Sequence, residues 1–303
     1  MRSLALSVLV MAACRSLEPA PFVPDAAELD TVRVATFNVR RFFDTVCDSG
    51  GCESDDYEAQ PSPAQFEARA EELATAIRVL AADVISLQEI ESQPCLDALV
   101  ARLGDVMPHA VLGEIGTVAS VDVAVMSRTP ISRVVGHRAA ELLPLPDGGT
   151  TRFSRELLEV HVEGGALIVF AAHFRSKSND DPARRLAEAQ VARRVVTEVG
   201  AREPGAVVVL AGDLNDTPGS PPLDALVGDG GLVRLADDLA PAAQATYSYG
   251  GQGQAIDHLL VTRGRGEAAR VPRSSRVWHG HPAWGWGGSD HAALTSELVL
   301  DPR

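Results

Sequence analysis

The stretch that most constrains this chain is residues 207–218, Val-Val-Val-Leu-Ala-Gly-Asp-Leu-Asn-Asp-Thr-Pro. Its β-branched apolar start predicts a buried strand, and that strand ends abruptly in Gly212, Asp213, Asn215 and Asp216. Carboxylates at the end of a buried strand cost several kcal/mol unless they are paired or hold a cation. We therefore ask what these side chains face.

Other strand ends of the chain carry polar side chains of the same kinds. Each has an ordinary explanation when it is taken alone, because an Asn after a strand is usually a turn residue and a Glu there is usually solvated. Their joint occurrence indicates convergence on one site at the edge of the sheets. These residues are Asn38, Glu89, His173, Asp257 with His258, and Asp290 with His291.

Hydrophobic periodicity predicts one domain over residues 31–303, without an internal repeat or a dividing linker. The composition, 46% apolar in 303 residues, allows one large α/β domain. We expect two packed mixed sheets with helices outside. Helices are predicted at 63–80, 95–103, 181–199 and 221–227, and strands at 31–37, 83–88, 121–126, 131–137, 153–162, 166–172, 207–212, 255–262 and 292–300.

Turn signals refine this pattern. Residues 127–130 predict a turn that makes the strands on either side of it antiparallel neighbours, and residues 163–165 predict a hairpin. Ser62 before Pro63 predicts the start of a helix. The stretches 44–61 and 270–288 are expected to be irregular.

The N-terminus predicts export. A basic start, an apolar run over residues 4–13 and then Cys14 are typical of a bacterial signal over residues 1–14. The residues before Cys14 resemble a lipobox, in which the Cys is acylated and anchors the chain to a membrane. Plain secretion is the next alternative, and an uncleaved anchor comes last, since about ten apolar residues are too few to span a bilayer. Residues 15–30 are expected to be a tether.

Three cysteines remain after Cys14 is set aside. In an oxidising compartment, Cys47 and Cys52 could close a short loop as a disulfide. Pairing of Cys95 with one of them, or free buried cysteines, are the alternatives. A metal site built from these cysteines is not expected, because no His lies at ligand spacing.

Seven short motifs, in order, resemble the signature set of the endonuclease/exonuclease/phosphatase superfamily. That superfamily includes deoxyribonuclease I-like nucleases, abasic-site endonucleases, inositol polyphosphate 5-phosphatases and bacterial sphingomyelinases. Residues 173–190 and 247–258 are similar to those of its exported bacterial nucleases. The motifs are Thr36-Phe-Asn-Val39, Ser86-Leu-Gln-Glu89, Ser154-Arg-Glu156, Ala172-His-Phe174, Gly212-Asp-Leu-Asn-Asp216, Ile256-Asp-His258 and Gly288-Ser-Asp-His291.

The resemblance implies a four-layer α/β/β/α sandwich and metal-assisted attack of water on phosphorus. It implies that Glu89, with Asn38 and Asp290, holds a hard divalent cation. That cation would be Mg²⁺, with Mn²⁺ or Ca²⁺ as alternatives.

The resemblance also assigns catalytic roles. Asp213 would orient or deprotonate the attacking water, and Asn215 would hold that water or a phosphate oxygen. His291, oriented by Asp257, would stabilise charge in the transition state. His173 would be a second imidazole in contact with the phosphate.

Three basic residues are candidates for substrate binding. Arg155 could support the phosphate or a nearby carboxylate. Arg175 and Lys177 could hold a nucleic-acid backbone, with solvated surface charge as the alternative.

Other polar and aromatic residues near these motifs have simpler expected roles. Asp216 is expected to cap its loop, and His258 to be structural because it points away from Asp257. The tryptophans of the segment before Ser289 could stack bases or touch lipid, or they could pack the loop; they are Trp278, Trp284 and Trp286.

The predicted function is an exported metal-dependent phosphodiesterase whose partner is nucleic acid, DNA first. A formal charge of −14 argues against binding through a general basic surface, but a bound metal supplies positive charge locally. A phosphomonoesterase or lipid phosphodiesterase, acting on inositol phosphate or sphingomyelin, is the alternative. A binding protein with a dead site is disfavoured, because the whole set of expected catalytic side chains is retained. No protein partner is implied.

Overall fold

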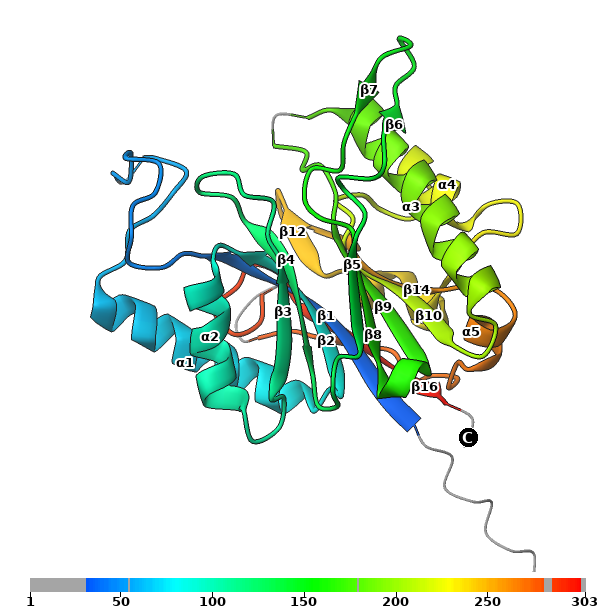
Figure 1. The fold of residues 1–303 in the computed structure, drawn as a ribbon, viewed down its shortest axis with the longest axis horizontal. Coiled ribbons are helices and arrows are strands. Elements are labelled where there is room, and N and C mark those ends of the chain that lie inside the picture. Colours follow the sequence, from blue (N-terminus) through cyan, green and yellow to red (C-terminus); the bar gives the residue numbers. More distant parts are fainter. Residues whose placement is uncertain (1–30, 54, 179, 281–284, 301–303) are drawn as a thin grey trace, which may run out of the picture.

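Two six-stranded mixed sheets pack face to face, with helices on their outer faces (Figure 1). In spatial order, the first sheet consists of β15 (Arg276–Trp278), β16 (Ala293–Val299), β1 (Thr31–Phe42), β2 (Val84–Ile90), β4 (Asp122–Ser127) and β3 (His109–Gly113). The second consists of β11 (Val233–Arg234), β14 (Asp257–Val261), β10 (Val207–Asp213), β9 (Leu167–His173), β8 (Leu158–Val162) and β5 (Arg133–Gly136). The computed structural model describes residues 31–53, 55–178, 180–280 and 285–300, so the predicted export signal, Cys14 and the tether lie outside the described residues.

Helices complete the four layers. On one side, α1 (Pro63–Leu80) and α2 (Gln93–Leu103) cover the first sheet; on the other, α3 (Pro182–Arg202) and α4 (Pro221–Val227) cover the second (Figure 1). A short helix, α5 (Arg265–Ala268), follows β14, and the hairpins β6 (Leu143–Pro144)–β7 (Thr150–Thr151) and β12 (Tyr247–Tyr249)–β13 (Gln252–Gln254) lie outside the two sheets. The predicted four-layer α/β/β/α sandwich is confirmed.

An apolar layer joins the two sheets. Val34 and Val123 of the first sheet and Val209 and Leu259 of the second belong to one buried cluster. Burial of each such side chain contributes about 1.5–3 kcal/mol. Because strand residues alternate between faces, the opposite faces of both sheets pack against the helices. The packing of this inter-sheet layer sets how far apart the strand ends of the two sheets lie.

One predicted strand pairing is wrong. β4 pairs with β2 and β3 in the first sheet, whereas β5 pairs with β8 in the second. Residues 128–132 therefore cross from one sheet to the other instead of closing a hairpin. A turn signal cannot distinguish these two cases when the strands on either side of it belong to stacked sheets.

Smaller differences concern element ends. The strand predicted from residue 153 begins at Leu158, the edge strand β15 lies in the stretch expected to be irregular, and β3 was not predicted. The predicted start of α1 is confirmed, because the Ser62 side chain accepts the Gln65 N–H in a capping box. Within the described residues, no helix has the length and apolar character needed to cross a membrane.

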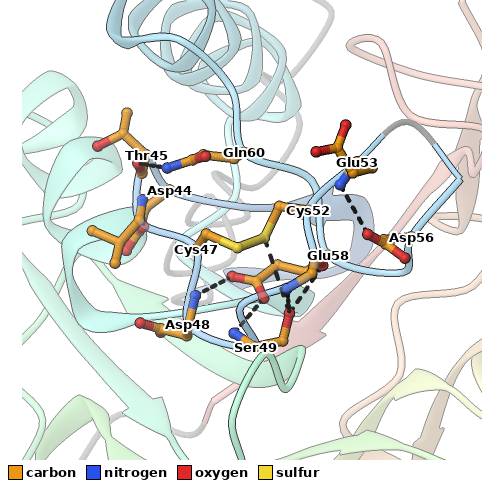
Figure 2. The surroundings of a disulfide bond; sticks show 12 residues. Asp44, Thr45, Cys47, Asp48, Ser49, Cys52, Glu53, Asp56, Glu58 and Gln60 are labelled. Carbon is orange, nitrogen blue, oxygen red and sulfur yellow. Dashed lines mark hydrogen bonds between the residues drawn. A yellow bond between two sulfur atoms is a disulfide. The ribbon is translucent and has the colours of Figure 1, made fainter.

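In the loop between β1 and α1, a disulfide joins Cys47 and Cys52 (Figure 2). Cys95 is a buried free thiol. Pairing of Cys95 with either residue is therefore wrong. The Glu58 carboxylate accepts the backbone N–H groups of Asp48 (2.6 Å) and Ser49 (2.7 Å) inside this loop, as Figure 2 shows. The disulfide and this carboxylate together give the loop a defined shape.

Candidate active site

The ends of strands from both sheets open into one cleft of about 750 Å³. β2 leads to Glu89, β9 ends at His173 and β10 ends at Asp213, while His291 lies just before β16. Seven residues predicted for the site line this cleft: Glu89, His173, Lys177, Asp213, Asn215, Asp290 and His291. Two others, Asn38 and Asp257, are buried against these lining residues.

Asn38 connects the two sheets at the floor of the cleft. Its Nδ2 donates to Glu89 Oε1 (3.1 Å) and to Asp213 Oδ2 (3.0 Å). Its Oδ1 accepts the backbone N–H of Arg40 (2.9 Å). In this arrangement Asn38 holds two carboxylates in place, and its oxygen, which was predicted to bind the cation, is engaged by the backbone.

Glu89 sits at an irregularity of β2. The register of β2 shifts between Gln88 and Ile90, and Glu89 has a left-handed φ of +68°. Such a backbone costs about 1–3 kcal/mol in a residue other than glycine and is found mainly at functional sites. The carboxylate is fixed at both oxygens, since Oε2 accepts the Arg41 N–H at 2.8 Å.

His291 is held by two carboxylates. Its Nδ1 lies 2.9 Å from Asp257 Oδ2, and its Nε2 lies 4.0 Å from Asp213 Oδ2. Burial lowers the pKa of His291, but the charge and hydrogen bond of Asp257 outweigh burial and raise that pKa to about 10. Burial and the Asp257 charge raise the pKa of Asp213. The geometry matches the predicted pairing of His291 with Asp257.

His173 is the second imidazole of the cleft. Its Nε2 lies 3.7 Å from Asp213 Oδ2. Burial and the positive charges of Arg155 and His291 hold its pKa well below the usual value. The ring is therefore neutral, and it can donate or accept one hydrogen bond at a phosphate but does not add charge.

Asn215 follows β10 with a left-handed φ of +54°, which Asn tolerates better than most residues. Its backbone N–H donates to Asp213 Oδ1 (2.9 Å), and its Nδ2 donates to the carbonyl of Phe174 (3.2 Å). The turn thus orients the Asp213 carboxylate while the Asn215 side chain lines the cleft.

Basic residues border the cleft in two groups. Arg40 lies near Asp290, whose side chain is 41% exposed, with Nε 3.7 Å from Oδ2. Lys177 lines the cleft but pairs with Asp216 at 2.9 Å. A hollow of about 380 Å³ adjoins the cleft at Glu89 and His173, and the predicted Arg155 and Arg175 line it.

Several cleft residues were missed from sequence. Arg40 and Arg41 line the cleft, as do Tyr247 and Tyr249. The Tyr247 ring lies 4.8 Å from the His291 ring, between centroids. The signal for Arg40 and Arg41 was present, because two consecutive basic residues directly follow the polar end of the first strand.

Ser289 is a further missed residue. Its Oγ donates to the Asn38 carbonyl (2.7 Å) and accepts the His291 N–H (3.1 Å). This hydroxyl therefore fixes the loop that carries His291 to the end of β1.

Asp216 and His258 lie outside the cleft, as predicted. The Asp216 carboxylate pairs with the buried Arg185 (2.9 Å) and with Lys177. The His258 ring bonds the Asp216 carbonyl (2.9 Å) and accepts from Arg234, and burial with the Arg234 charge lowers its pKa to about 4. Both residues support the loop after β10.

Trp278 and Trp286 pack the loop and do not line the cleft. The rings of Trp278 and Trp286 lie 5.8 Å apart, and both pack against the core under the first sheet. The indole N–H of Trp286 donates to the Ala76 carbonyl of α1 (3.1 Å). Trp284 lies outside the described residues.

The donor set of the cleft fits a hard divalent cation. The carboxylates of Glu89, Asp213 and Asp290 line the cleft, and an oxygen of Asp257 lies within 4.8 Å of one of Asp213. Oε and Oδ atoms are the ligands that Mg²⁺, Mn²⁺ and Ca²⁺ prefer. Among the described residues, Asp257 Oδ1 is buried without a hydrogen-bond partner. The residues present are therefore compatible with a bound cation.

Carboxylates, a carboxamide and two imidazoles at the edge of paired sheets define a metal-dependent hydrolase of phosphoric esters. Residues 35–291 match the profile of the Endonuclease/Exonuclease/phosphatase family, and the chain belongs to that family. Its members are metal-dependent phosphoesterases that act on DNA, lipids or other phosphate esters.

Solved structures share the fold. TDP2 from Caenorhabditis elegans has a TM-score of 0.60 and 15% identity, covering 89% of this chain and 74% of that chain. An endonuclease/exonuclease/phosphatase from Beutenbergia cavernae DSM 12333 has a TM-score of 0.56 and 23% identity, with coverage of 89% and 72%. Sphingomyelinase C from Streptomyces griseocarneus has a TM-score of 0.56 and 20% identity, with coverage of 88% and 99%. These likenesses establish the fold alone, and no curated protein sequence matches significantly.

Proposed function

We propose that this protein is a metal-dependent phosphodiesterase that hydrolyses nucleic acid, with DNA as the first substrate. The observation that carries the proposal is the cleft lining, which combines hydrolytic side chains with cations and aromatic rings. Arg40, Arg41 and Lys177 can neutralise a phosphate backbone. Tyr247 and Tyr249, the latter 70% exposed, offer rings on which bases stack.

The hydrolytic residues divide the chemistry between them. Asp213 orients the attacking water and accepts its proton, a role favoured by a raised pKa. His291, kept cationic by Asp257, stabilises negative charge on the phosphate oxygens. His173, as a neutral ring, forms a hydrogen bond to the phosphate. The backbone N–H of Asn215 orients the Asp213 carboxylate.

Glu89 and Asp290 would hold Mg²⁺, and Asn38 would position the Glu89 carboxylate for it. When bound, the cation supplies positive charge that neutralises the phosphate. Mn²⁺ or Ca²⁺ could take the same oxygen ligands.

Two relatives bear on the substrate. TDP2 from D. rerio was crystallised with a single-stranded DNA product, and it shares 16% identity and a TM-score of 0.59 with this chain. Sphingomyelinase C favours the alternative of a lipid phosphodiesterase on the same active site. Within the described residues, Ile256 is the one aliphatic side chain that lines the cleft, which favours a polar polymer over a lipid.

Export is part of the proposal. The disulfide between Cys47 and Cys52 supports an oxidising compartment. Acylation of Cys14 would then attach the enzyme to a membrane. Mass spectrometry of the N-terminus of the protein isolated from its own cells tests this step: a diacylglyceryl Cys14 supports the anchor, and an intact Met1 contradicts export.

The test of the activity uses protein lacking residues 1–14 and supercoiled plasmid DNA. We expect DNA to be degraded with Mg²⁺ or Mn²⁺, EDTA to stop the reaction, and Asp213→Ala and His291→Ala to lower the rate by orders of magnitude. RNA, sphingomyelin and inositol phosphates are tested in parallel. Absence of DNA and RNA cleavage together with clear hydrolysis of sphingomyelin or an inositol phosphate would replace this proposal by the alternative.

A further inference from the structure

A second polar cluster lies below the end of β1, apart from the cleft. Asp44, Glu91 and Cys95 are all buried, and each offers a ligand atom within 4.8 Å of the other two. Glu91, 5% exposed, accepts the Asp44 N–H at Oε2 (2.7 Å). Its Oε1 is buried and has no hydrogen-bond partner among the described residues.

The surroundings do not neutralise this cluster. The charged groups that act most strongly on Glu91 are Asp44, Glu58 and Asp48, all of which are acidic. Across the described ranges, neither Asp44 nor Glu91 forms an ion pair with a basic side chain. A buried carboxylate oxygen without a partner is costly, and a bound cation would remove that cost.

Ser92 also turns toward this cluster. It is the N-cap residue of α2, yet its side chain does not cap the helix. Its Oγ instead donates to Asp44 Oδ2 (2.7 Å) and lies 3.5 Å from Cys95 Sγ. The side chains of Glu91, Ser92 and Cys95, at the junction of β2 and α2, thus all lie close to Asp44.

We propose that Asp44, Glu91 and Cys95 bind a structural Zn²⁺ ion at a site separate from the catalytic cleft. Zn²⁺ accepts thiolate together with carboxylate ligands, whereas Mg²⁺ and Ca²⁺ select oxygen. The absence of His at ligand spacing hid this site in the sequence, because two of its ligands are carboxylates that come from separate strand ends.

Binding requires the Cys95 thiol to lose its proton, and the Glu91 carboxyl, whose pKa burial raises to about 7, must also be ionised. Cys95 Sγ donates to the Phe42 carbonyl (3.1 Å), and burial raises the pKa of the thiol to about 12. The Zn–S bond therefore forms as the thiol proton leaves to solvent, and affinity rises with pH. Bound Zn²⁺ would connect Asp44, just after β1, with Glu91, two residues beyond Glu89, and with Cys95 in the first turn of α2.

The test uses the full chain with Cys14→Ser, so that Cys95 is the only free thiol beside the Cys47–Cys52 disulfide. The chain is stripped with EDTA, dialysed and titrated with Cd²⁺, which gives an ultraviolet charge-transfer band only when thiolate binds it. We expect the band to saturate at one equivalent, calorimetry to show Zn²⁺ competing for that site, and Zn²⁺ to raise the melting temperature. Mg²⁺ should produce no band.

Three variants separate the outcomes. Cys95→Ala removes the band, and the near-isosteric Glu91→Gln weakens Zn²⁺ binding at least about 10-fold, the scale at which a lost ligand acts. Glu89→Gln, in the cleft, leaves the band intact. Absence of the band in the parent protein, or unchanged Zn²⁺ affinity in Glu91→Gln with native circular dichroism, overturns the proposal. None of these readouts depends on phosphodiesterase activity.

Discussion

His291 Nδ1 lies 2.9 Å from Oδ2 of Asp257, a carboxylate that is completely buried. The hydrogen bond fixes the imidazole ring so that its Nε2 points toward Asp213. It also opposes the effect of burial on the ring, because the charge and hydrogen bond of Asp257 raise the pKa of His291, with smaller contributions from Asp213 and Asp290. The orientation of His291, and the largest share of the stabilisation of its charge, therefore come from one neighbour.

Replacement of that neighbour should change the pH profile. In the parent enzyme, the pKa of His291 is raised, so the cation persists through neutral pH and is lost only as pH rises toward about 10. Asp257→Asn removes the largest raising charge and leaves burial, opposed by Asp213 and Asp290 alone, so the alkaline limb of kcat/KM moves to lower pH. We expect kcat at pH 7 to fall about 10²–10⁴-fold. Measured pH–rate profiles on DNA check this, and an unmoved limb contradicts the role of His291.

Substitutions of Asp213 and of Asp216 should have different effects, the first mainly on the catalytic rate and the second mainly on the free energy of unfolding. Asp213→Asn removes a buried charge that Asp257 repels, so the metal-free protein becomes more stable while kcat falls by about 10³-fold or more. Asp216→Asn leaves the buried Arg185 with Asp180 as its remaining ion-pair partner, so stability falls by about 1–3 kcal/mol while the folded enzyme keeps most of its activity. Urea unfolding and turnover of both variants provide the comparison. Equal losses of activity in the two variants would contradict the assignment of a catalytic role to Asp213 and a structural role to Asp216.

Asn38→Asp should make folding depend on the cation. The change replaces a donor to Glu89 and Asp213 by a third carboxylate. We expect a loss of about 2–4 kcal/mol in EDTA, most of it recovered with Mg²⁺. Asn38→Ala is the matched control, since it removes the hydrogen bonds without adding charge. Equal unfolding midpoints of the two variants in EDTA would rule out repulsion as the cause.

The disulfide should stabilise the loop beside the cleft. Cys47→Ser with Cys52→Ser opens a loop of sequence separation 5, which costs about 2 kcal/mol in chain entropy. Tyr57 lies five residues beyond Cys52 in the same connection between β1 and α1, and Arg41 stacks on its ring at 4.5 Å from the centroid. We therefore expect a higher KM for DNA with little change in kcat, measured by steady-state kinetics. An unchanged KM would show that Arg41 is held without the loop.

Arg41 should contribute to salt-dependent binding of DNA. In an Asp213→Asn background, Arg41→Ala should reduce the slope of log K against log salt concentration by about one phosphate contact, or 0.9. Arg133→Ala, at an exposed position of β5 away from the cleft, is the control and should leave the slope unchanged. Fluorescence anisotropy at several salt concentrations measures both. Identical slopes for the two variants would show that Arg41 does not contact the DNA backbone.

The layers and strand ends were predictable because apolar periodicity and terminal polar residues are local signals. The crossing between β4 and β5 was not, since a turn such as residues 127–130 carries no information about which sheet receives the next strand. Only the packing of one sheet on the other decides that.

The predicted site residues lie together, but some of their contacts depend on the backbone. Asn38 looks like an oxygen ligand in sequence, yet the tight turn at Arg40 occupies its carbonyl oxygen. The left-handed backbone of Glu89 is equally invisible, because Glu has no preference for it. The pairing of Arg41 with Tyr57 depends on a loop whose fold is set by a disulfide and a buried carboxylate.

The proposed catalytic residues are divided between two sheets that apolar packing and a few hydrogen bonds, such as that from Asn38 to Asp213, hold together. Glu89 belongs to one sheet and Asp213 to the other, so the apolar layer that contains Val123 and Val209 acts as the spacer of the active site. We therefore expect activity to be lost when one sheet shifts relative to the other, at a lower temperature than the unfolding of either sheet. A substrate that contacts both sheets across the cleft should stabilise their relative position. Heat inactivation of the enzyme should therefore be slower when substrate is bound.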